Sequence, residues 1–318
     1  MNKKLITAAL LSLLLLPGYD SGKQTEDIYI LYTNDVASAI DENFGYAGVK
    51  GYKDMLEEEH QYVALVDAGD YFDGKLAAKS EGRDIVQLMN AVGYDAVTIG
   101  NQEFSIGIRA LSRNIRRSKF NYVSCNIRYT GKSWNLLRRV KPYVIKKYGP
   151  IKVAYIGVTT PETLIPGKMS YLACLEDEEI VYDFYQADDG KELYDQVQKT
   201  VDEVRNQVDY VIVLAHLGSN NVTEGFSSYD LITHTRGIDA VIDGHSHTPI
   251  LGEPVLNLDG EDVALTSTGQ KFQNLGVMVL RSDHTIFTNL YPTIYESDEK
   301  IAKMVEDIKA KYSSEQQG

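Results

Sequence analysis

Residues 238–247 read IDAVIDGHSH, an apolar run typical of a buried strand that ends in two histidines separated by one residue. Gly244 directly precedes the two histidines. Two imidazoles spaced in this way can address two metal ions, but they can equally belong to a polar loop. The other strands of the chain decide between the two interpretations.

Four further apolar runs also end in polar side chains that can bind metals. They are followed by Asp35 (after LYTN), Asp70 (after DAG), Asn101 (after TIG) and His216 (after VIVLA). A single such Asp usually caps a turn, and a single His is usually a satisfied polar residue. Ligand sites gather at strand ends on one edge of an α/β sheet, so five polar strand ends predict one site. Oxygen and imidazole ligands suit Mn²⁺, Zn²⁺, Mg²⁺ or Ca²⁺, and we expect up to two such ions.

The order of apolar runs and amphipathic segments predicts an α/β fold. Helices are expected near residues 46–60, 84–93, 191–207 and 297–312. Residues 142–158 predict two strands around a Tyr-Gly-Pro turn, and residues 263–269 and 275–281 predict a second pair of adjacent strands. One domain over residues 25–294, followed by a helix and tail at 295–318, is the simplest division.

The first 24 residues have the layout of a secretory signal peptide and a short linker. Two lysines precede an apolar run over residues 5–16, and Pro-Gly follows. As a helix this run is about 18 Å long, too short for a bilayer core of about 30 Å. A helix in the protein core is the alternative. Tyr19 occupies the position where a lipoprotein would need Cys, so we expect a released periplasmic or extracellular protein without a membrane span.

The net charge of −13 makes unassisted binding to nucleic acid an unfavourable interpretation. We find neither a repeat nor a basic patch that would favour a surface-binding role. A small anionic substrate would need cations at its site, which again favours metal ions. Cys125 and Cys174 could form a disulfide in an exported protein, or they could be two buried thiols.

Taken in order, the strand-end motifs resemble those of the calcineurin-like metallophosphoesterase superfamily. The likeness is to the N-terminal catalytic domain of bacterial secreted 5′-nucleotidases, over roughly residues 28–280. That family has D-x-H, G-D, G-N-H-E-F-D, H-L-G and G-H-S-H. This chain has DVA (35–37), GD (69–70), GNQEFS (100–105), HLG (216–218) and GHSH (244–247), together with the family-like segments GVTTPET (157–163) and TSTGQ (266–270). The resemblance implies a four-layer α-β-β-α sandwich with two mixed sheets.

The resemblance also implies hydrolysis of phosphate monoesters such as nucleotides at a two-metal site. Asp70 would bridge the two ions. The remaining ligands implied are Asn101, His216 and His245 for one ion, and Asp35 and His247 for the other.

Three positions depart from the family pattern. Ala37 replaces a histidine that would bind the second ion, Gln102 replaces the histidine that assists the leaving group, and Ser105 replaces the aspartate that orients it. A positioned acid or base usually contributes about 10² to 10⁴ in rate, and Gln102 cannot transfer a proton at neutral pH. We therefore predict impaired catalysis. The alternative is a non-catalytic protein that binds a metal or a phosphate.

Two other features concern the substrate and the general acid. The chain ends after a helix that, in the family, leads into a nucleotide-binding C-terminal domain, so nucleotide specificity is not implied. His60, His234 and His284 sit in no motif, and the sequence leaves open whether folding brings one of them into the site.

Overall fold

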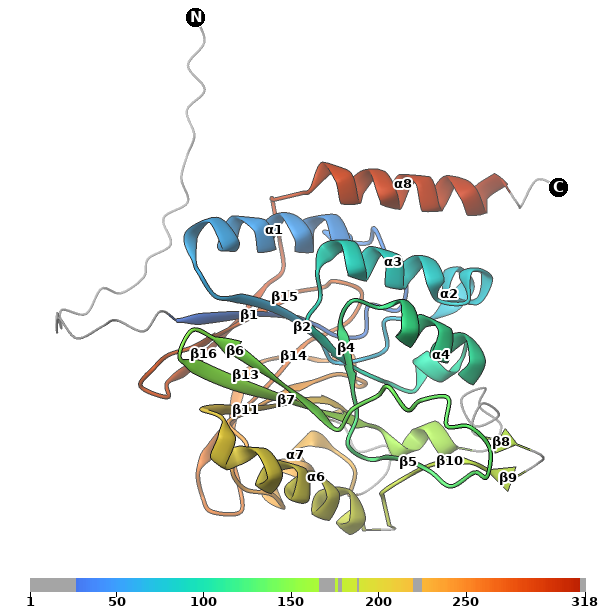
Figure 1. The fold of residues 1–318 in the computed structure, drawn as a ribbon. Coiled ribbons are helices and arrows are strands. Elements are labelled where there is room, and N and C mark those ends of the chain that lie inside the picture. The colour runs from blue at the N-terminus through green and yellow to red at the C-terminus, as the bar shows by residue number, and fades with distance from the viewer. Residues whose placement is uncertain (1–26, 166–174, 177–178, 188, 220–224, 315–318) are drawn as a thin grey trace, which may run out of the picture.

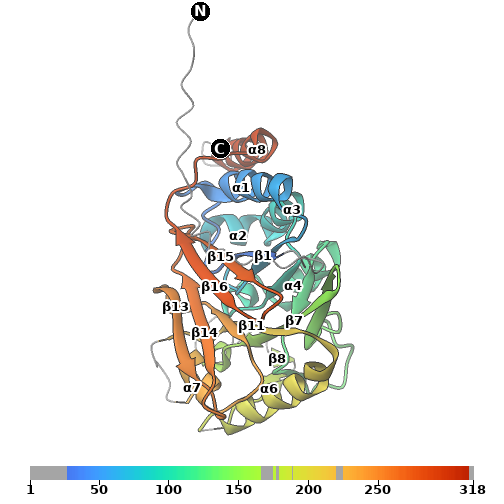
Figure 2. The ribbon, with the colours of Figure 1, turned by 90° about the vertical axis from the view of Figure 1, so that its left-hand side faces the viewer.

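The computed structural model describes residues 27–165, 175–176, 179–187, 189–219 and 225–314. Two six-stranded sheets stack face to face, and helices cover the outer face of each sheet (Figures 1 and 2). The predicted four-layer α/β sandwich is confirmed.

The first sheet has the order β16-β15-β1-β2-β3-β4. Strands β1 to β4 run parallel, whereas β15 is antiparallel to β1 and β16 to β15. The bounds are β1 Ile28–Thr33, β2 Val63–Asp67, β3 Ala96–Thr98, β4 Asn121–Val123, β15 Leu275–Leu280 and β16 Ile286–Tyr291.

The second sheet has the order β13-β14-β12-β11-β7-β6, with β14, β12, β11 and β7 parallel and both edge strands antiparallel. The bounds are β6 Tyr143–Tyr148, β7 Ile151–Thr159, β11 Tyr210–His216, β12 Ala240–Asp243, β13 Pro249–Leu256 and β14 Asp262–Thr268. Two small ribbons lie apart from the sheets: β5 Ile127–Tyr129 with β10 Tyr182–Phe184, and β8 Leu175–Glu176 with β9 Glu179–Ile180.

One strand pairing differs from the sequence prediction. β6 and β7 form the expected antiparallel pair, but β14 and β15 lie in different sheets. The chain crosses between the sheets after β14, where the Asn34 side chain accepts the Thr268 amide and donates to the Gly269 carbonyl. Both strands are largely buried on both faces because each sheet is covered on both sides, so their sequences do not indicate which sheet they join.

Helices form the two outer layers. The first sheet is covered by α1 Gly45–Glu59, α2 Gly74–Ser80, α3 Arg83–Val92 and α4 Ile108–Arg117, and the second by α6 Lys191–Val204 and α7 Ser228–Thr233. Helix α8 Glu299–Ser314 packs on the outer side of α1 and α3. Short 3₁₀ turns are η1 Gln102–Phe104, η2 Pro161–Leu164 and η3 Arg205–Gln207. The helices predicted near residues 46–60, 84–93, 191–207 and 297–312 correspond to α1, α3, α6 and α8.

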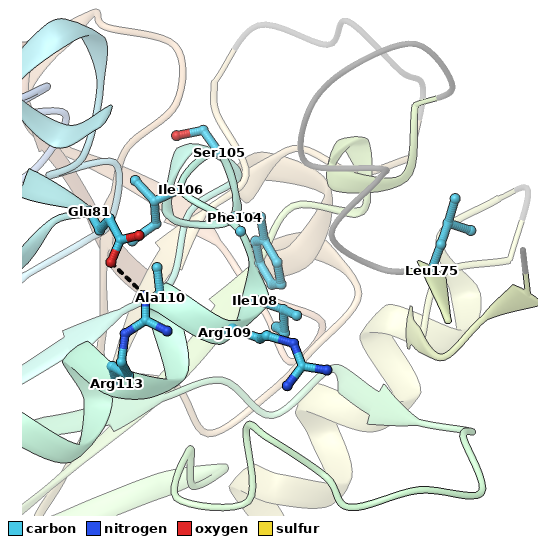
Figure 3. Close-up of a pocket in the computed structure, with 10 residues that line it drawn as sticks. Glu81, Phe104, Ser105, Ile106, Ile108, Arg109, Ala110, Arg113 and Leu175 are labelled. Atoms are coloured by element: carbon cyan, nitrogen blue, oxygen red, sulfur yellow. Dashed lines mark hydrogen bonds and ion pairs between the residues drawn. The ribbon is translucent and has the colours of Figure 1, made fainter. Parts of the chain in front are cut away.

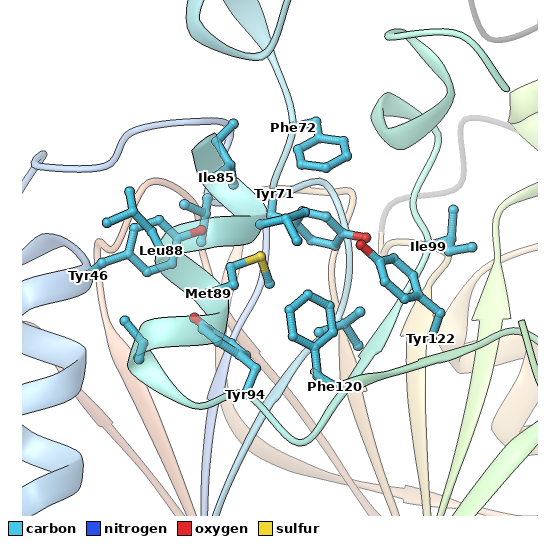
Figure 4. Packing of buried hydrophobic residues seen from close by; sticks show 14 of the residues in the cluster. Tyr46, Tyr71, Phe72, Ile85, Leu88, Met89, Tyr94, Ile99, Phe120 and Tyr122 are labelled. Atoms are coloured by element: carbon cyan, nitrogen blue, oxygen red, sulfur yellow. The ribbon is translucent and has the colours of Figure 1, made fainter. Parts of the chain in front are cut away.

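Apolar burial holds the layers together. Ile30 and Tyr32 of the first sheet share a buried cluster with Tyr155 and Ile212 of the second. On the outer side of the first sheet, α3 packs its apolar face against a group of buried aromatic rings (Figure 4). Together these clusters fix the two sheets relative to each other, and so fix the edge where their strands end.

The remaining expectations concern the termini and the cysteines. The signal-peptide segment and Cys174 lie outside the described residues. Cys125 is a buried free thiol whose pKa is raised by burial to about 12. Among the described residues, no helix combines the length and apolarity needed to cross a bilayer.

Candidate metal centre

The predicted ligands come from both sheets and meet where the parallel strands end. Asp35, Asp70 and Asn101 follow β1, β2 and β3 of the first sheet. His216 ends β11 of the second sheet, and His245 and His247 follow β12. The backbone amide of His245 donates to Asp35 Oδ2 over 2.9 Å, so a hydrogen bond joins the two sheets at this edge.

Three of these side chains form a compact group. One ligand atom each from Asp70, His216 and His245 lies within 4.8 Å of the other two. His216 Nε2 is 3.1 Å from Asp70 Oδ2. His216 Nδ1 must donate to the Ala68 carbonyl, 2.7 Å away, because a carbonyl oxygen only accepts. This bond turns Nε2 toward the two partners and leaves its lone pair available to a cation.

The polar atoms at this edge fit a bound cation. Asp35 Oδ1, Asn101 Oδ1 and His216 Nε2 are buried and make no aligned hydrogen bond. Buried polar atoms are nearly always satisfied, so three such atoms at one place indicate a further partner. Two carboxylate or amide oxygens and one imidazole nitrogen are a donor set that binds Mn²⁺, Zn²⁺ or Mg²⁺.

The local charges point the same way. Burial acts to lower the pKa of His216, but the Asp70 and Asp35 carboxylates raise it well above its usual range. Burial acts to raise the pKa of Asp70, but His216 and the Gln102 amide lower it. A divalent cation at this place would compete with a proton for the His216 nitrogen and the two carboxylates.

The backbone around the site is held in a conformation that favours glycine. Left-handed backbone in non-glycine residues is uncommon and collects at functional sites. Such φ angles occur at Asp35 (50°), Ala37 (51°), Ser38 (60°), Asp70 (57°), His245 (76°) and His247 (56°). Gly100 is required for a different reason, since a Cβ there would lie 2.1 Å from Asp70 Oδ1 and 2.8 Å from His216 Nε2.

The second half of the site is poorer in ligands. His247 Nε2 lies 3.4 Å from Asp35 Oδ1, and the His247 side chain is 49% exposed. Ala37 offers only a methyl group, although its amide still donates to the Asp70 carbonyl over 2.9 Å. Position 37 therefore contributes a backbone hydrogen bond to Asp70 but no side-chain ligand.

The loop that carries Gln102 and Ser105 is anchored by a residue that we did not assign from the sequence. Glu103 is fully buried and accepts the backbone amides of Asp70, Phe72 and Gly100 over 2.7–3.0 Å. The Gln102 amide donates to Asp70 Oδ1 over 2.8 Å. Its place inside the GNQEFS motif was the only signal for Glu103. Ser105 lines a cavity of about 590 Å³ beside α4 (Figure 3).

Glu162 is the second residue that sequence reasoning missed. It lies in η2, directly after β7, and its carboxylate Oε2 is 3.0 Å from His245 Nε2. A carboxylate at this nitrogen orients the ring and leaves Nδ1 as the ligand atom. The segment GVTTPET was the available signal, but nothing in it indicated which residue would reach the site.

Folding does not bring another histidine into the site. His60 stacks on Tyr29 near the start of β1, His234 stacks on Tyr194, and His284 lies against Tyr210 at the start of β11. Tyr29 and Tyr210 are at the opposite strand ends from the metal ligands. These three histidines are therefore not placed to act as an acid beside Gln102.

Comparison with known proteins agrees with this geometry. The sequence profile named Calcineurin-like phosphoesterase matches residues 28–249. Snake venom 5′-nucleotidase from Crotalus adamanteus is 30% identical over 243 residues, covering 70% of this chain and 37% of the relative. The trifunctional nucleotide phosphoesterase protein YfkN of Bacillus subtilis is 28% identical over 64% of this chain and 15% of its own length. This chain thus spans well under half of these relatives.

Solved structures show the same fold. The 5′-nucleotidase precursor from Thermus thermophilus superposes with a TM-score of 0.77 at 20% identity, covering 91% of this chain and 59% of that one. The calcineurin-like phosphoesterase YfkN from Bacillus subtilis gives 0.69 at 22% identity and covers 90% of this chain and 97% of its own.

Proposed function

Because this chain belongs to the calcineurin-like phosphoesterase family, we propose that it is a metal-dependent phosphoesterase with impaired turnover on phosphate monoesters such as nucleotides. The observation that carries the proposal is the group formed by the buried Asp70 and His216 with the half-buried His245, with Asp35 and Asn101 oxygens left unsatisfied beside it. Relatives named 5′-nucleotidase and nucleotide phosphoesterase support the substrate class.

The residues present divide the proposed work unevenly. Asp70, Asn101, His216 and His245 would hold one ion, and Asp35, Asp70 and His247 would hold the other more weakly. Bound divalent ions in such a site supply positive charge to the phosphate oxygens and an activated water nucleophile.

The loop residues would assist less than their counterparts in the family pattern. The Gln102 side chain can donate a hydrogen bond to a phosphate or leaving oxygen, but it cannot protonate the leaving group. Ser105 carries no charge that could orient an acid. Turnover would therefore depend on the ions and on an unassisted leaving group.

Ala37 and Gln102 together favour a second candidate function. With Ala37 at the second ion and Gln102 at the acid position, the site could bind a metal or a phosphate ester without turning it over. The two candidates differ in one observable, which is phosphate release from a metal-loaded protein.

Calorimetric titration with Mn²⁺, paired with a phosphatase assay on p-nitrophenyl phosphate and on nucleotides, tests the proposal. We expect one tight and one weak or absent metal site. Loss of a residue that only orients a ligand lowers metal affinity roughly 10- to 100-fold, and loss of a ligand itself should lower it by at least as much. Slow metal-dependent hydrolysis supports the enzyme. Tight metal binding with no hydrolysis supports the binding protein, and no metal binding contradicts both the enzyme and a metal-binding protein.

We also propose that the protein is exported. The short apolar run at residues 5–16 supports this, and mass spectrometry of protein recovered from periplasm or medium tests it. An exported protein that still begins at Met1 would contradict cleavage of the signal peptide.

A further inference from the structure

The positive charge of this acidic protein is concentrated in one segment. Between Glu103 and Glu162 the sequence has 13 of its 32 Lys and Arg residues and no Asp or Glu. The rest of the chain holds the other 19 basic residues and all 45 acidic ones. Our sequence-based statement that no basic patch exists was therefore wrong, because the net charge of −13 conceals a separation of charge along the chain.

Helix α4 places four of these charges on one face. At 100° per residue, Arg109, Arg113, Arg116 and Arg117 fall within an arc of about 100°. The buried residues of the helix are Ala110, Leu111, Ser112, Asn114 and Ile115. Figure 3 shows Arg109 and Arg113 projecting beside the cavity, where Arg113 pairs with Glu81 over 2.5 Å. Arg109, Arg116 and Arg117 are exposed and make no ion pair among the described residues.

The loop between β5 and β6 extends this positive region. The Ser112 hydroxyl of α4 donates to the Leu136 carbonyl over 2.9 Å, so the loop packs directly against the helix. Arg116 donates to the same hydroxyl over 2.8 Å. Arg138 and Arg139 follow Leu136 by two and three residues and are both exposed. We call the exposed arginines of α4 together with Lys132, Arg138 and Arg139 the basic face.

Two apolar side chains project beside these charges. Trp134 is the only tryptophan in the chain, is 66% exposed, and has the Arg138 guanidinium 4.4 Å from its ring centroid. Ile180 is 40% exposed and lines one surface hollow with Lys132 and the exposed Glu179. The Thr130 hydroxyl donates to the Ile180 carbonyl over 3.1 Å, which holds the β9 ribbon against the loop.

We propose that the basic face binds the surface of an anionic phospholipid bilayer, with Trp134 and Ile180 entering the headgroup region. Cations near an anionic membrane gain favourable energy from the surface potential, and an exposed Trp is well suited to the interface between headgroups and acyl chains. A nucleic acid would also attract the arginines, but it offers no apolar environment for Ile180. The strongly acidic remainder of the molecule would be repelled by the lipid and would orient the basic face toward it.

Co-sedimentation of the whole protein with vesicles tests the proposal, with Trp134 emission as a second readout. We expect binding to phosphatidylcholine vesicles that contain phosphatidylglycerol, a blue shift of the emission, and little binding to pure phosphatidylcholine. Salt should weaken binding, because screening shortens the range of exposed charges. Arg116→Glu with Arg139→Glu should weaken binding by at least about tenfold.

A charge-matched control separates the basic face from net charge. Lys199→Glu with Lys300→Glu changes the net charge by the same amount on α6 and α8 and should bind as the parent does, and circular dichroism checks that both variants fold. Equal loss in the control and the basic-face variant would overturn the proposal. So would vesicle binding without any change in Trp134 emission, or binding to single-stranded DNA in place of vesicles.

Discussion

At the scale of single residues, the loops beside Asp70 contribute backbone hydrogen bonds, whereas Ala37 and Gln102 offer no imidazole. The Ala37 amide still donates to the Asp70 carbonyl, and the Gln102 amide still donates to the Asp70 carboxylate. Sequence reasoning identified the direct metal-ligand candidates, because strand ends and motif order mark them. It missed Glu103 and Glu162, which position the loops and His245 and do not follow a metal-ligand spacing. Such residues are recognised only once the fold brings distant segments together.

Restoring the missing side chains should restore chemistry. Ala37→His adds the absent metal ligand, and Gln102→His with Ser105→Asp adds an acid and its orienting carboxylate. We expect the loop pair alone to help little, Ala37→His alone to help more, and the triple variant to exceed the product of the separate gains, because these groups act as a unit. The measurement is kcat/KM for p-nitrophenyl phosphate in Mn²⁺.

An imidazole one position away is the matched control for that series. Ser38→His should give no gain in kcat/KM, because its imidazole would start from the neighbouring backbone position and would not occupy the place of a side chain at position 37. A folded triple variant that binds two ions and still releases no phosphate would show that the rest of the pocket has diverged. In that case the binding-protein candidate would replace the enzyme.

Glu162 should matter for metal binding through His245. Glu162→Gln removes the charge that orients the imidazole, and the affinity for Mn²⁺ should fall about 10- to 100-fold. Titration calorimetry measures this, and the melting temperature in EDTA should stay close to that of the parent. Glu253→Gln, on an exposed carboxylate paired with Tyr229, is the control and should leave affinity unchanged. An unchanged affinity in Glu162→Gln would mean that His245 is positioned without it.

At the scale of elements, the amphipathic helices were predictable and the sheet assignment of β14 and β15 was not. A helix shows its buried face by the periodicity of its apolar residues, whereas a strand covered on both sides shows no such periodicity.

Helix α8 is a predicted element whose packing only the structure reveals. Ile301, Val305 and Ile308 are buried, and Lys311 and Tyr312 both donate to the buried Asp84 carboxylate over 2.7 Å.

The attachment of α8 should therefore depend on pH. Burial acts to raise the pKa of Asp84, but hydrogen bonds from Lys311, Tyr312 and Arg83 lower it. A carboxyl with a lowered folded pKa stabilises the native state above its unfolded pKa, and that stability is lost as the pH falls through the folded pKa. Asp84→Asn should lower the free energy of unfolding by about 1–2 kcal/mol at pH 7. The difference between parent and variant should shrink when the pH falls below 3.8, the ordinary pKa of an aspartate.

Urea unfolding of parent and variant over a pH series measures this difference. Asp307→Asn is the matched change on the same helix, in an exposed pair with Lys303, and should leave the stability close to that of the parent. A constant difference between Asp84→Asn and the parent from pH 7 to pH 3 would mean that the ionised carboxylate contributes nothing to holding α8.

At the scale of the whole molecule, the site is a junction between two sheets. The motif order predicted both the sandwich and the edge where ligands gather, because family resemblance carries the topology. Sequence alone contained no distances and did not reveal that Asp35 and His245 join the sheets by a hydrogen bond. Nor did it show which face of the folded protein collects the arginines, since that depends on how α4 and the following loop pack.

The junction leads to a prediction for the whole fold. A cation held by Asp70 and Asn101 from one sheet and His216 and His245 from the other binds only when both sheets are in place. Free energy of binding therefore adds to the free energy of unfolding, by about 2.7 kcal/mol when the metal is at 100 times its dissociation constant. For a protein of this size each kcal/mol corresponds to roughly 2–4 °C, so Mn²⁺ should raise the melting temperature by about 5–10 °C relative to that in EDTA.

Scanning calorimetry measures this shift and should show one unfolding transition that moves as a unit. Asp70→Asn should abolish the shift, whereas Asp73→Asn on the exposed start of α2 should preserve it. If Mn²⁺ stabilises Asp70→Asn as much as the parent, the ion binds elsewhere and the two sheets are not joined through it.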